Sequence, residues 1–141
     1  MRENGVDLYI VHPKVVAEMV SQITDDEELI CAAYLHDTIE DVMIHKPNDV
    51  KALNELKNEI RFLGADVLKY VEALSHDENK ESYEEYLKRV CKDRNLIIIK
   101  MCDLIYNVTD SPDDEKRYRK SLFVLFRSLI NAPDAEHEIK D

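Results

Sequence analysis

The amino-acid sequence predicts an all-α protein with a single domain of about six to eight helices. Only 2 glycines and 4 prolines occur among the 141 residues, too few for the turns of a many-stranded protein. Apolar residues make up 45% of the chain and recur at helical spacing. A chain of this length suits one domain. We therefore expect one domain over residues 1–132 and a polar tail over residues 133–141.

The individual helices are predicted from their capping signals. Pro13 suits the first turn of a helix, which would place His12 at that helix's N-terminus. Thr24 followed by Glu27 is a capping-box pattern, and the helix that it opens is expected to run without a break beyond Ile39. Further helices are expected to begin at Asn48 (ending at Gly64), at Ala65 (ending at Leu74), at Ser82, at Asp93 or Asn95 (ending at Val108), and at Ser111.

One apolar stretch is ambiguous by pattern alone. Leu96 is followed by three isoleucines, a composition that also favours a short buried strand. We favour a helix here, because a lone strand would have no partner in this chain.

The charge and cysteine content exclude several classes of protein. Lys and Arg total 19 and Asp and Glu total 30, a formal net charge of −11, which disfavours binding to nucleic-acid polymers or a polybasic contact with membranes. The chain has no signal-peptide pattern and no apolar run near the roughly 18 to 20 residues of a membrane span. Cys31, Cys91 and Cys102 lack a CxxC spacing, so we expect buried free thiols and a cytoplasmic protein.

The residues that carry chemistry concentrate in one segment. On a helix, His36 and Asp37 would share one side with Glu40 and Asp41, which gathers an imidazole and three carboxylates. Clustered carboxylates repel one another, and a divalent cation would remove that repulsion. The segment by itself fits a metal site and a solvated helix end about equally well.

A second acidic position lies far along the chain. Asp103 and Asn107 are four residues apart in an otherwise apolar helix. A buried carboxylate is destabilising unless it has a partner, and that partner could be Lys100, an arginine or a metal ion.

These residues together resemble a known family. His12, the doublet His36-Asp37 and Asp103 follow the H…HD…D order of the HD phosphohydrolases. The segments around them are similar to the hydrolase domain of RelA/SpoT-type alarmone enzymes, in the small stand-alone form, over roughly residues 2–130. Those segments are Arg2-x-x-Gly5, Tyr9-Ile10-x-His12-Pro13, Leu35-His36-Asp37-x-Ile39-Glu40-Asp41, Lys100-x-x-Asp103-x-x-x-Asn107 and Ser82-Tyr83-x-x-Tyr86.

The resemblance implies a metal centre. It implies one divalent metal, usually manganese, held by His12, His36, Asp37 and Asp103. Two nitrogen and two carboxylate donors without a thiolate agree with Mn²⁺, and Zn²⁺, Fe²⁺ and Mg²⁺ stay open as alternatives.

The resemblance also implies a reaction and residues for it. The reaction is hydrolysis of the 3′-pyrophosphate of (p)ppGpp to GDP or GTP and pyrophosphate. Glu40 would be the first choice for acid–base chemistry with Asp41 beside it, and Arg2 and Asn107 would bind the nucleotide. The expected partner is thus a small nucleotide, with the oligomeric state left open.

Two alternative functions stay open at this point. Leu104 and Tyr106 replace an Arg and a His of the larger family enzymes, so the substrate could be another nucleotide or a phosphomonoester. A non-catalytic nucleotide-binding module is the third possibility. A second doublet, His76-Asp77, lacks an acidic pair four residues later, and we interpret it as a loop rather than a metal site.

Overall fold

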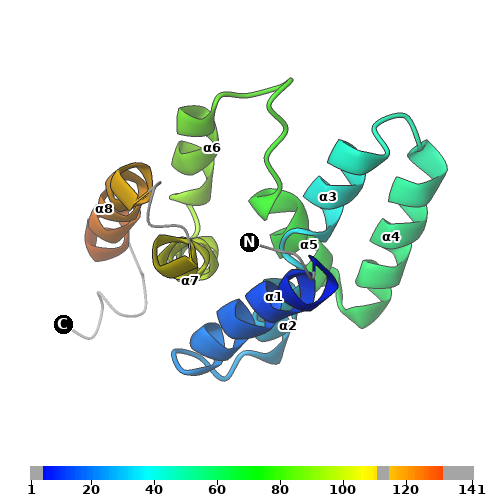
Figure 1. Ribbon diagram of the computed structural model, residues 1–141. Helices are drawn as coiled ribbons and strands as arrows, with labels where there is room; N and C mark the ends of the chain where they lie inside the picture. Colours follow the sequence, from blue (N-terminus) through cyan, green and yellow to red (C-terminus); the bar gives the residue numbers. More distant parts are fainter. Residues whose placement is uncertain (1–4, 111–114, 132–141) are drawn as a thin grey trace.

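Eight α-helices and no strand make up the described part of the chain. The structure is a computed structural model that describes residues 5–110 and 115–131, with side chains described for residues 12–108 and 116–131. The prediction of an all-α fold is confirmed. The helices are α1 (Gly5–Ser21), α2 (Glu27–Leu35), α3 (Thr38–His45), α4 (Val50–Leu63), α5 (Ala65–Leu74), α6 (Tyr83–Val90), α7 (Arg94–Asp110) and α8 (Glu115–Asn131) (Figure 1).

Two helices, α5 and α7, organise the packing. Helix α5 contacts α2, α3, α4, α6 and α7, and α7 also contacts α1 and α8. Helices α4 and α8 lie at opposite edges of the molecule (Figure 1). Fully buried apolar side chains from α1, α5, α6 and α7 join in one core, among them Val16, Val71, Val90, Ile97 and Ile99. The predicted tail over residues 133–141 lies outside the described residues, and the domain boundary at residue 132 stays a prediction.

Most helix starts lie within two residues of the predicted positions. Asp26 rather than Thr24 caps α2, and Asp49 rather than Asn48 caps α4, in each case by accepting backbone N–H bonds. The predicted Ser82 start is confirmed with a complete capping box. These caps satisfy N–H groups that the first turn of a helix leaves unpaired.

The ambiguous apolar stretch is helical, as favoured. The three isoleucines lie within α7, and Ile97 and Ile99 are fully buried in the core. The three cysteines are free, and Cys102 is buried while Cys31 and Cys91 are half-buried.

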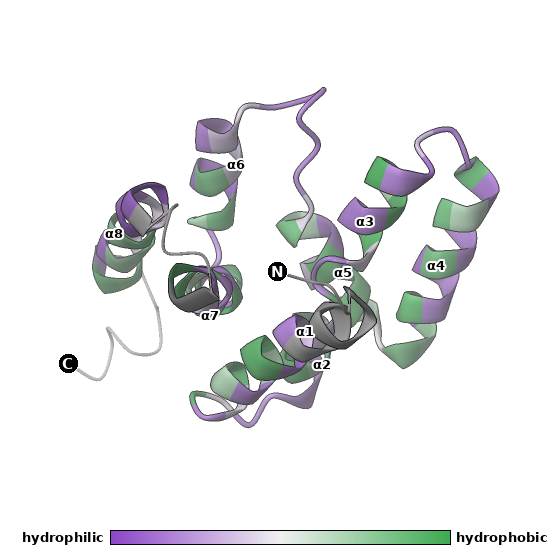
Figure 2. Ribbon diagram, in the orientation of Figure 1, coloured by the Kyte–Doolittle hydropathy of each residue, from purple (hydrophilic) through white to green (hydrophobic). Residues whose placement is uncertain are grey.

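The helices show the amphipathic pattern of a globular domain. Figure 2 shows hydrophilic and hydrophobic residues together on α4 and α6, which lie at the surface. Within residues 5–110 and 115–131, no helix combines the length and apolarity needed to cross a membrane.

Candidate metal centre

Four side chains from three separate parts of the chain meet at one point. His12 comes from α1, His36 and Asp37 from the turn between α2 and α3, and Asp103 from α7. One ligand atom from each lies within 4.8 Å of all the others. His12 Nε2 is 2.9 Å from Asp103 Oδ1 and 3.7 Å from Asp37 Oδ2. The packing of α1 against α2 and α7 therefore brings together the four residues that the family resemblance implied as metal ligands.

His36 is oriented by the end of its own helix. Its Nδ1 lies 2.6 Å from the carbonyl oxygen of Ala33, and because a carbonyl only accepts, Nδ1 carries the proton. Its Nε2 is buried and has no hydrogen-bond partner, although Asp37 Oδ2 and Asp103 Oδ1 lie 3.3 and 3.4 Å away. A buried nitrogen without a hydrogen bond is destabilising, and a metal ion is the partner that such a lone pair fits.

The charges around His36 agree with a cation site. Burial by itself would lower the pKa of His36, but Asp103 and Asp37 outweigh it and raise this pKa to about 9. The two carboxylates thus favour positive charge at this buried ring. A divalent cation would supply that charge and satisfy the same carboxylates.

Asp103 divides its two oxygens between two kinds of partner. Oδ1 faces His12 and His36, while Oδ2 accepts from Lys100 Nζ at 3.1 Å. Burial would raise the pKa of Asp103, but Lys100 and the two histidines hold it well below its usual range. Burial would likewise lower the pKa of Lys100, and the Asp103 charge holds it well above its ordinary value. Both partners that the sequence suggested for Asp103, a lysine and a metal cluster, are therefore compatible in one arrangement.

The prediction of an unbroken helix through the HD segment was wrong. Helix α2 ends at Leu35 and α3 begins at Thr38, so His36 and Asp37 lie in a turn. The Thr38 hydroxyl donates to the Leu35 carbonyl oxygen at 2.7 Å, which helps to close this turn. The turn changes the direction of the chain, and the two donors consequently lie together while the acidic pair follows on a separate helix.

The prediction that His12 begins a helix was also wrong. Pro13 lies inside α1, which starts at Gly5. A proline in a helix interior removes one backbone hydrogen bond, which is destabilising. Burial of Val16, Ala17 and Val20 one to two turns later stabilises the helix in spite of this.

The two acidic residues after the doublet lie in different surroundings. Glu40 Oε1 accepts from the backbone N–H of His76 at 2.9 Å. Burial raises the pKa of Glu40, and the His76 N–H partly offsets that shift. Asp41 lines a hollow of about 470 Å³ between α3 and α4, together with Thr38, Val42, His45 and Leu56.

The two residues predicted to bind the nucleotide are only partly described. Asn107 is half-buried on α7, one turn beyond Asp103. Arg2 lies outside the described residues. Their roles stay predictions.

The second HD doublet forms a loop, as predicted, and it also contributes a contact that sequence reasoning missed. His76 lies between α5 and α6. The centroid of its ring is 4.9 Å from that of the Tyr86 ring and 5.9 Å from that of the Tyr83 ring. Its backbone N–H reaches Glu40, which lies 36 residues earlier in the sequence. No side-chain pattern could have indicated this contact, because a backbone amide is present at nearly every position.

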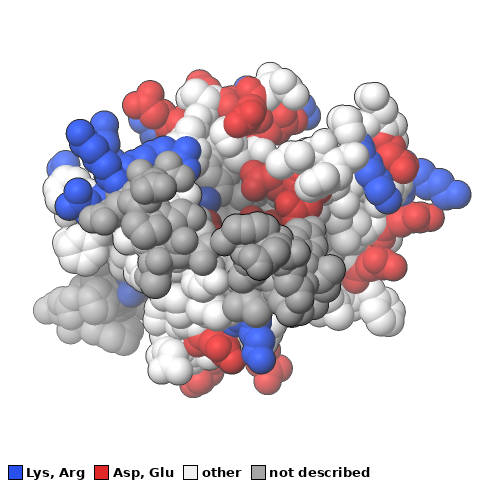
Figure 3. Space-filling view, viewed as in Figure 1, with Lys and Arg blue, Asp and Glu red and all other residues white. Residues whose placement is uncertain are grey.

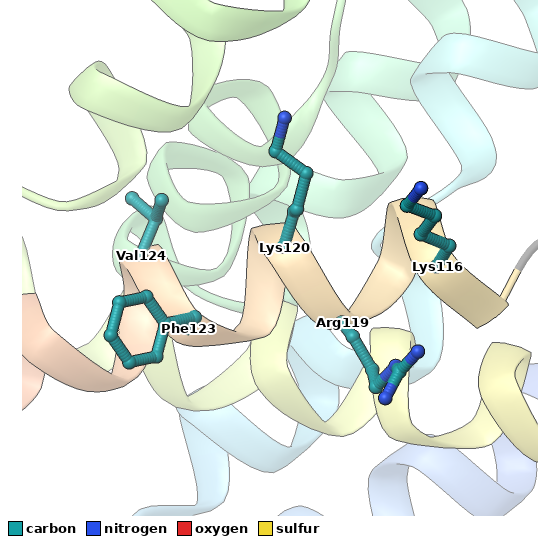
Figure 4. Close-up of a pocket in the computed structure, with 5 residues that line it drawn as sticks. All are labelled: Lys116, Arg119, Lys120, Phe123 and Val124. Carbon is teal, nitrogen blue, oxygen red and sulfur yellow. The ribbon is translucent and has the colours of Figure 1, made fainter.

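Side chains of both charges occur over the visible face, but they are unevenly distributed (Figure 3). Figure 3 shows acidic side chains around a hollow in the middle of one face, and basic side chains over α8 at its edge. A hollow of about 350 Å³ lies along α8 and includes none of the four clustered donors. In Figure 4, Lys116 and Lys120 point to one side of α8 and Arg119 and Phe123 to the other, with Val124 completing the lining.

Comparisons with known proteins agree with this geometry. The model of the HD domain family matches residues 9–108. A guanosine-3′,5′-bis(diphosphate) 3′-pyrophosphohydrolase of Haemophilus influenzae is 27% identical over 143 residues, which covers 92% of this chain and 20% of that protein. The enzyme of the same name from Aquifex aeolicus is 33% identical over 107 residues, which covers 71% of this chain and 14% of the relative. A GTP pyrophosphokinase of Myxococcus xanthus is 30% identical over 128 residues, which covers 84% of this chain and 16% of that protein.

These relatives are much longer proteins. The chain spans about a fifth or less of their length. No solved structure matches the chain significantly. The family match nevertheless covers more than half of the 141 residues and runs through all four clustered donors. This protein belongs to the HD domain family.

Proposed function

We propose that this chain is a metal-dependent phosphohydrolase that removes the 3′-pyrophosphate of (p)ppGpp, yielding GDP or GTP and pyrophosphate. The observation that carries the proposal is the four-donor cluster around the buried, unpaired Nε2 of His36. Similarity to several proteins named guanosine-3′,5′-bis(diphosphate) 3′-pyrophosphohydrolase supports the choice of substrate.

The cluster fits a divalent cation by its donor chemistry. His12, His36, Asp37 and Asp103 would hold it through two imidazole nitrogens and two carboxylate oxygens, a set that suits Mn²⁺ first. When bound, such a cation supplies Lewis-acid chemistry that activates water and neutralises phosphate charge.

Glu40 is the residue that we assign to proton transfer. Its Oε1 is held by the His76 amide, which fixes the carboxylate and leaves the second oxygen to accept a proton from the attacking water. Burial raises the pKa of Glu40, which brings it closer to the neutral range in which a general base works best. Asp41 would assist from the next position of α3.

Two residues are assigned to the nucleotide, and a third offsets negative charge at the cluster. Lys100 is paired with Asp103 and offsets part of the negative charge of the cluster. Arg2 and Asn107 are assigned to the nucleotide, with Asn107 donating hydrogen bonds from the same helix that carries Asp103.

One observation favours a second candidate substrate. Leu104 stands where the larger enzymes that the sequence resembles carry an arginine, and it is buried in the core. The chain therefore offers no cation to the substrate at that position. Hydrolysis of another nucleotide, or of a phosphomonoester, is the alternative function that this difference favours.

A substrate panel tests both candidates. The protein, loaded with Mn²⁺, is incubated with ppGpp, GTP and other nucleotides, and released pyrophosphate and phosphate are measured. Pyrophosphate release from ppGpp that is lost in His36→Ala and Glu40→Gln would support the proposal. The matched controls are His45→Ala, an exposed histidine of α3, and Glu55→Gln, an exposed glutamate of α4. Orthophosphate from a different nucleotide would favour the alternative, and binding without turnover under any metal would overturn both.

A further inference from the structure

Three consecutive carbonyl groups at the C-terminal end of α5 are held by side chains of α6. Arg89 Nη1 donates to the carbonyl oxygen of Ala73 at 2.6 Å, and Arg89 Nη2 donates to that of Ser75 at 3.2 Å. Between them, the Tyr86 hydroxyl donates to the Leu74 carbonyl oxygen at 2.6 Å. The last carbonyls of a helix lack partners within the helix, so α6 supplies them here.

The peptide unit between Ser75 and His76 connects these three carbonyl groups to the candidate active site. The Ser75 carbonyl and the His76 N–H belong to one peptide unit, which is planar and rigid. Arg89 binds the carbonyl edge of that unit, and Glu40 Oε1 accepts from its N–H edge at 2.9 Å. The orientation of the donor that holds Glu40 is therefore set by the guanidinium on the other side. A cation bound to the carbonyl also polarises the peptide and makes its N–H a stronger donor.

Arg89 is itself fixed in place. Its Nη2 and Nε donate to the two carboxylate oxygens of Glu81 at 2.6 and 3.2 Å, in a bidentate pair. His76 Nε2 lies 3.1 Å from the backbone oxygen of Glu81, and this contact joins the beginning of the α5–α6 loop to its end. The guanidinium stands over the Tyr86 ring, 5.3 Å from its centroid. Four of the five N–H groups of Arg89 are thus engaged, by Ala73 at the end of α5 and by Ser75 and Glu81 in the loop that follows.

We propose that Arg89 is a positioning residue for Glu40, acting through the Ser75–His76 peptide. The inference rests on the proposed function only for what Glu40 does in the reaction. The arrangement itself, a guanidinium and a carboxylate on opposite edges of one peptide, is independent of the substrate. Loss of Arg89 frees the peptide to rotate, and Glu40 then loses its fixed orientation.

Kinetics of three variants test the effect on the reaction. Arg89→Met should lower kcat for ppGpp by about tenfold, a fraction of what a general base contributes, and change KM by less than about twofold. Arg89→Lys should recover part of kcat, since a lysine can hold one carbonyl but cannot form the fork. Lys88→Met removes the same charge from an exposed neighbouring position of α6 and should behave like the wild type.

A second readout does not depend on turnover. The backbone amide of His76 is observed by nitrogen-15 NMR in the protein loaded with diamagnetic Zn²⁺ or Mg²⁺, because paramagnetic Mn²⁺ would broaden the signal of a nearby amide. Glu40→Ala removes the acceptor and should shift this amide proton upfield, and Arg89→Met should shift it in the same direction. If the wild type does not hydrolyse ppGpp, the proposed function fails, while the amide signal still decides the role of Arg89.

Several results would overturn the inference. A folded Arg89→Met variant with the wild-type His76 amide signal would do so, as would one with unchanged kcat. A loss of thermal stability and activity in Arg89→Met that Arg89→Lys does not relieve would indicate a merely structural role. If Arg89→Met does not fold, Arg89→Lys is compared with Tyr86→Phe instead. Tyr86→Phe removes the hydrogen bond to the Leu74 carbonyl but leaves the contacts of the Ser75–His76 peptide in place, so it should lower kcat less than Arg89→Lys does.

Discussion

Lys100 and Asp103 form a buried ion pair one turn apart on α7, with Lys100 Nζ 3.1 Å from Asp103 Oδ2. Only 15% of the lysine side chain and 7% of the aspartate side chain are exposed. The other Asp103 oxygen lies 2.9 Å from His12 Nε2. One carboxylate therefore links the helix core to the candidate metal centre.

Lys100→Met should destabilise the metal-free protein. The variant leaves the Asp103 carboxylate buried without its lysine, and breaking a buried pair in this way lowers the free energy of unfolding by about 3–5 kcal/mol. Urea denaturation in EDTA measures the change. Lys88→Met is the control and should unfold at the wild-type urea concentration. Equal midpoints for Lys100→Met and the wild type would contradict the prediction.

A divalent metal should stabilise the fold through the four-donor cluster. At a Mn²⁺ concentration 100-fold above its Kd, the free energy of unfolding should rise by about 2.7 kcal/mol, and EDTA should reverse the gain. His36→Ala should lose this increment, because it removes a buried donor. His45→Ala should retain it. Thermal unfolding with and without Mn²⁺ measures the difference, and a metal-dependent gain that survives in His36→Ala would argue against the assigned ligands.

Alkaline pH should unfold the protein partly through Tyr86. Burial raises the pKa of Tyr86 to about 12, although the Lys100 charge acts in the opposite direction. Since the folded-state pKa lies above the ordinary value of 10, the contribution to stability is complete below about pH 10 and disappears as the pH rises to about 12. The loss over this range should approach about 2–3 kcal/mol.

The matching variant is Tyr86→Phe. It removes the hydrogen bond to the Leu74 carbonyl, so its stability at neutral pH is lower, but it should show a shallower decline between pH 10 and 12. Urea midpoints measured at each pH give the two slopes. Parallel slopes would mean that other groups cause the alkaline transition.

Gly64→Ala should destabilise the junction between α4 and α5. Gly64 has φ +156°, a conformation that residues with a side chain rarely adopt, and a Cβ there would meet the Glu28 carboxylate and Val67. Backbone strain of this kind costs about 1–3 kcal/mol. Adding Glu28→Ala to Gly64→Ala separates the two causes. Full recovery in the double variant would assign the loss to the clash and not to the backbone conformation.

Local features of the fold could be predicted from the sequence because they depend on neighbouring residues. The Ser82 capping box is complete within four residues. The Ile97–Ile99 segment is helical, and residues 5–110 and 115–131 contain no strand with which it could pair. The break at His36 and Asp37 was missed, since the apolar pattern of α2 continues to Ile39 and only packing shows that the chain turns there. The prediction that Pro13 lies in the first turn of its helix was wrong for a related reason. Burial of Val16 and Val20 in the tertiary structure stabilises a helix that continues on both sides of Pro13.

The sequence by itself determined the all-α class, the residue types of the candidate metal centre and their order along the chain. The class follows from composition and helical periodicity, and the candidate ligands follow from the resemblance of the H…HD…D order to a known family. Only the tertiary structure decided that His12 and Asp103 lie 2.9 Å apart, that His36 Nε2 is buried without a partner, and that the His76 amide holds Glu40. Such contacts depend on how whole helices pack, and a backbone amide or an unpaired lone pair leaves no trace in the identity of a residue.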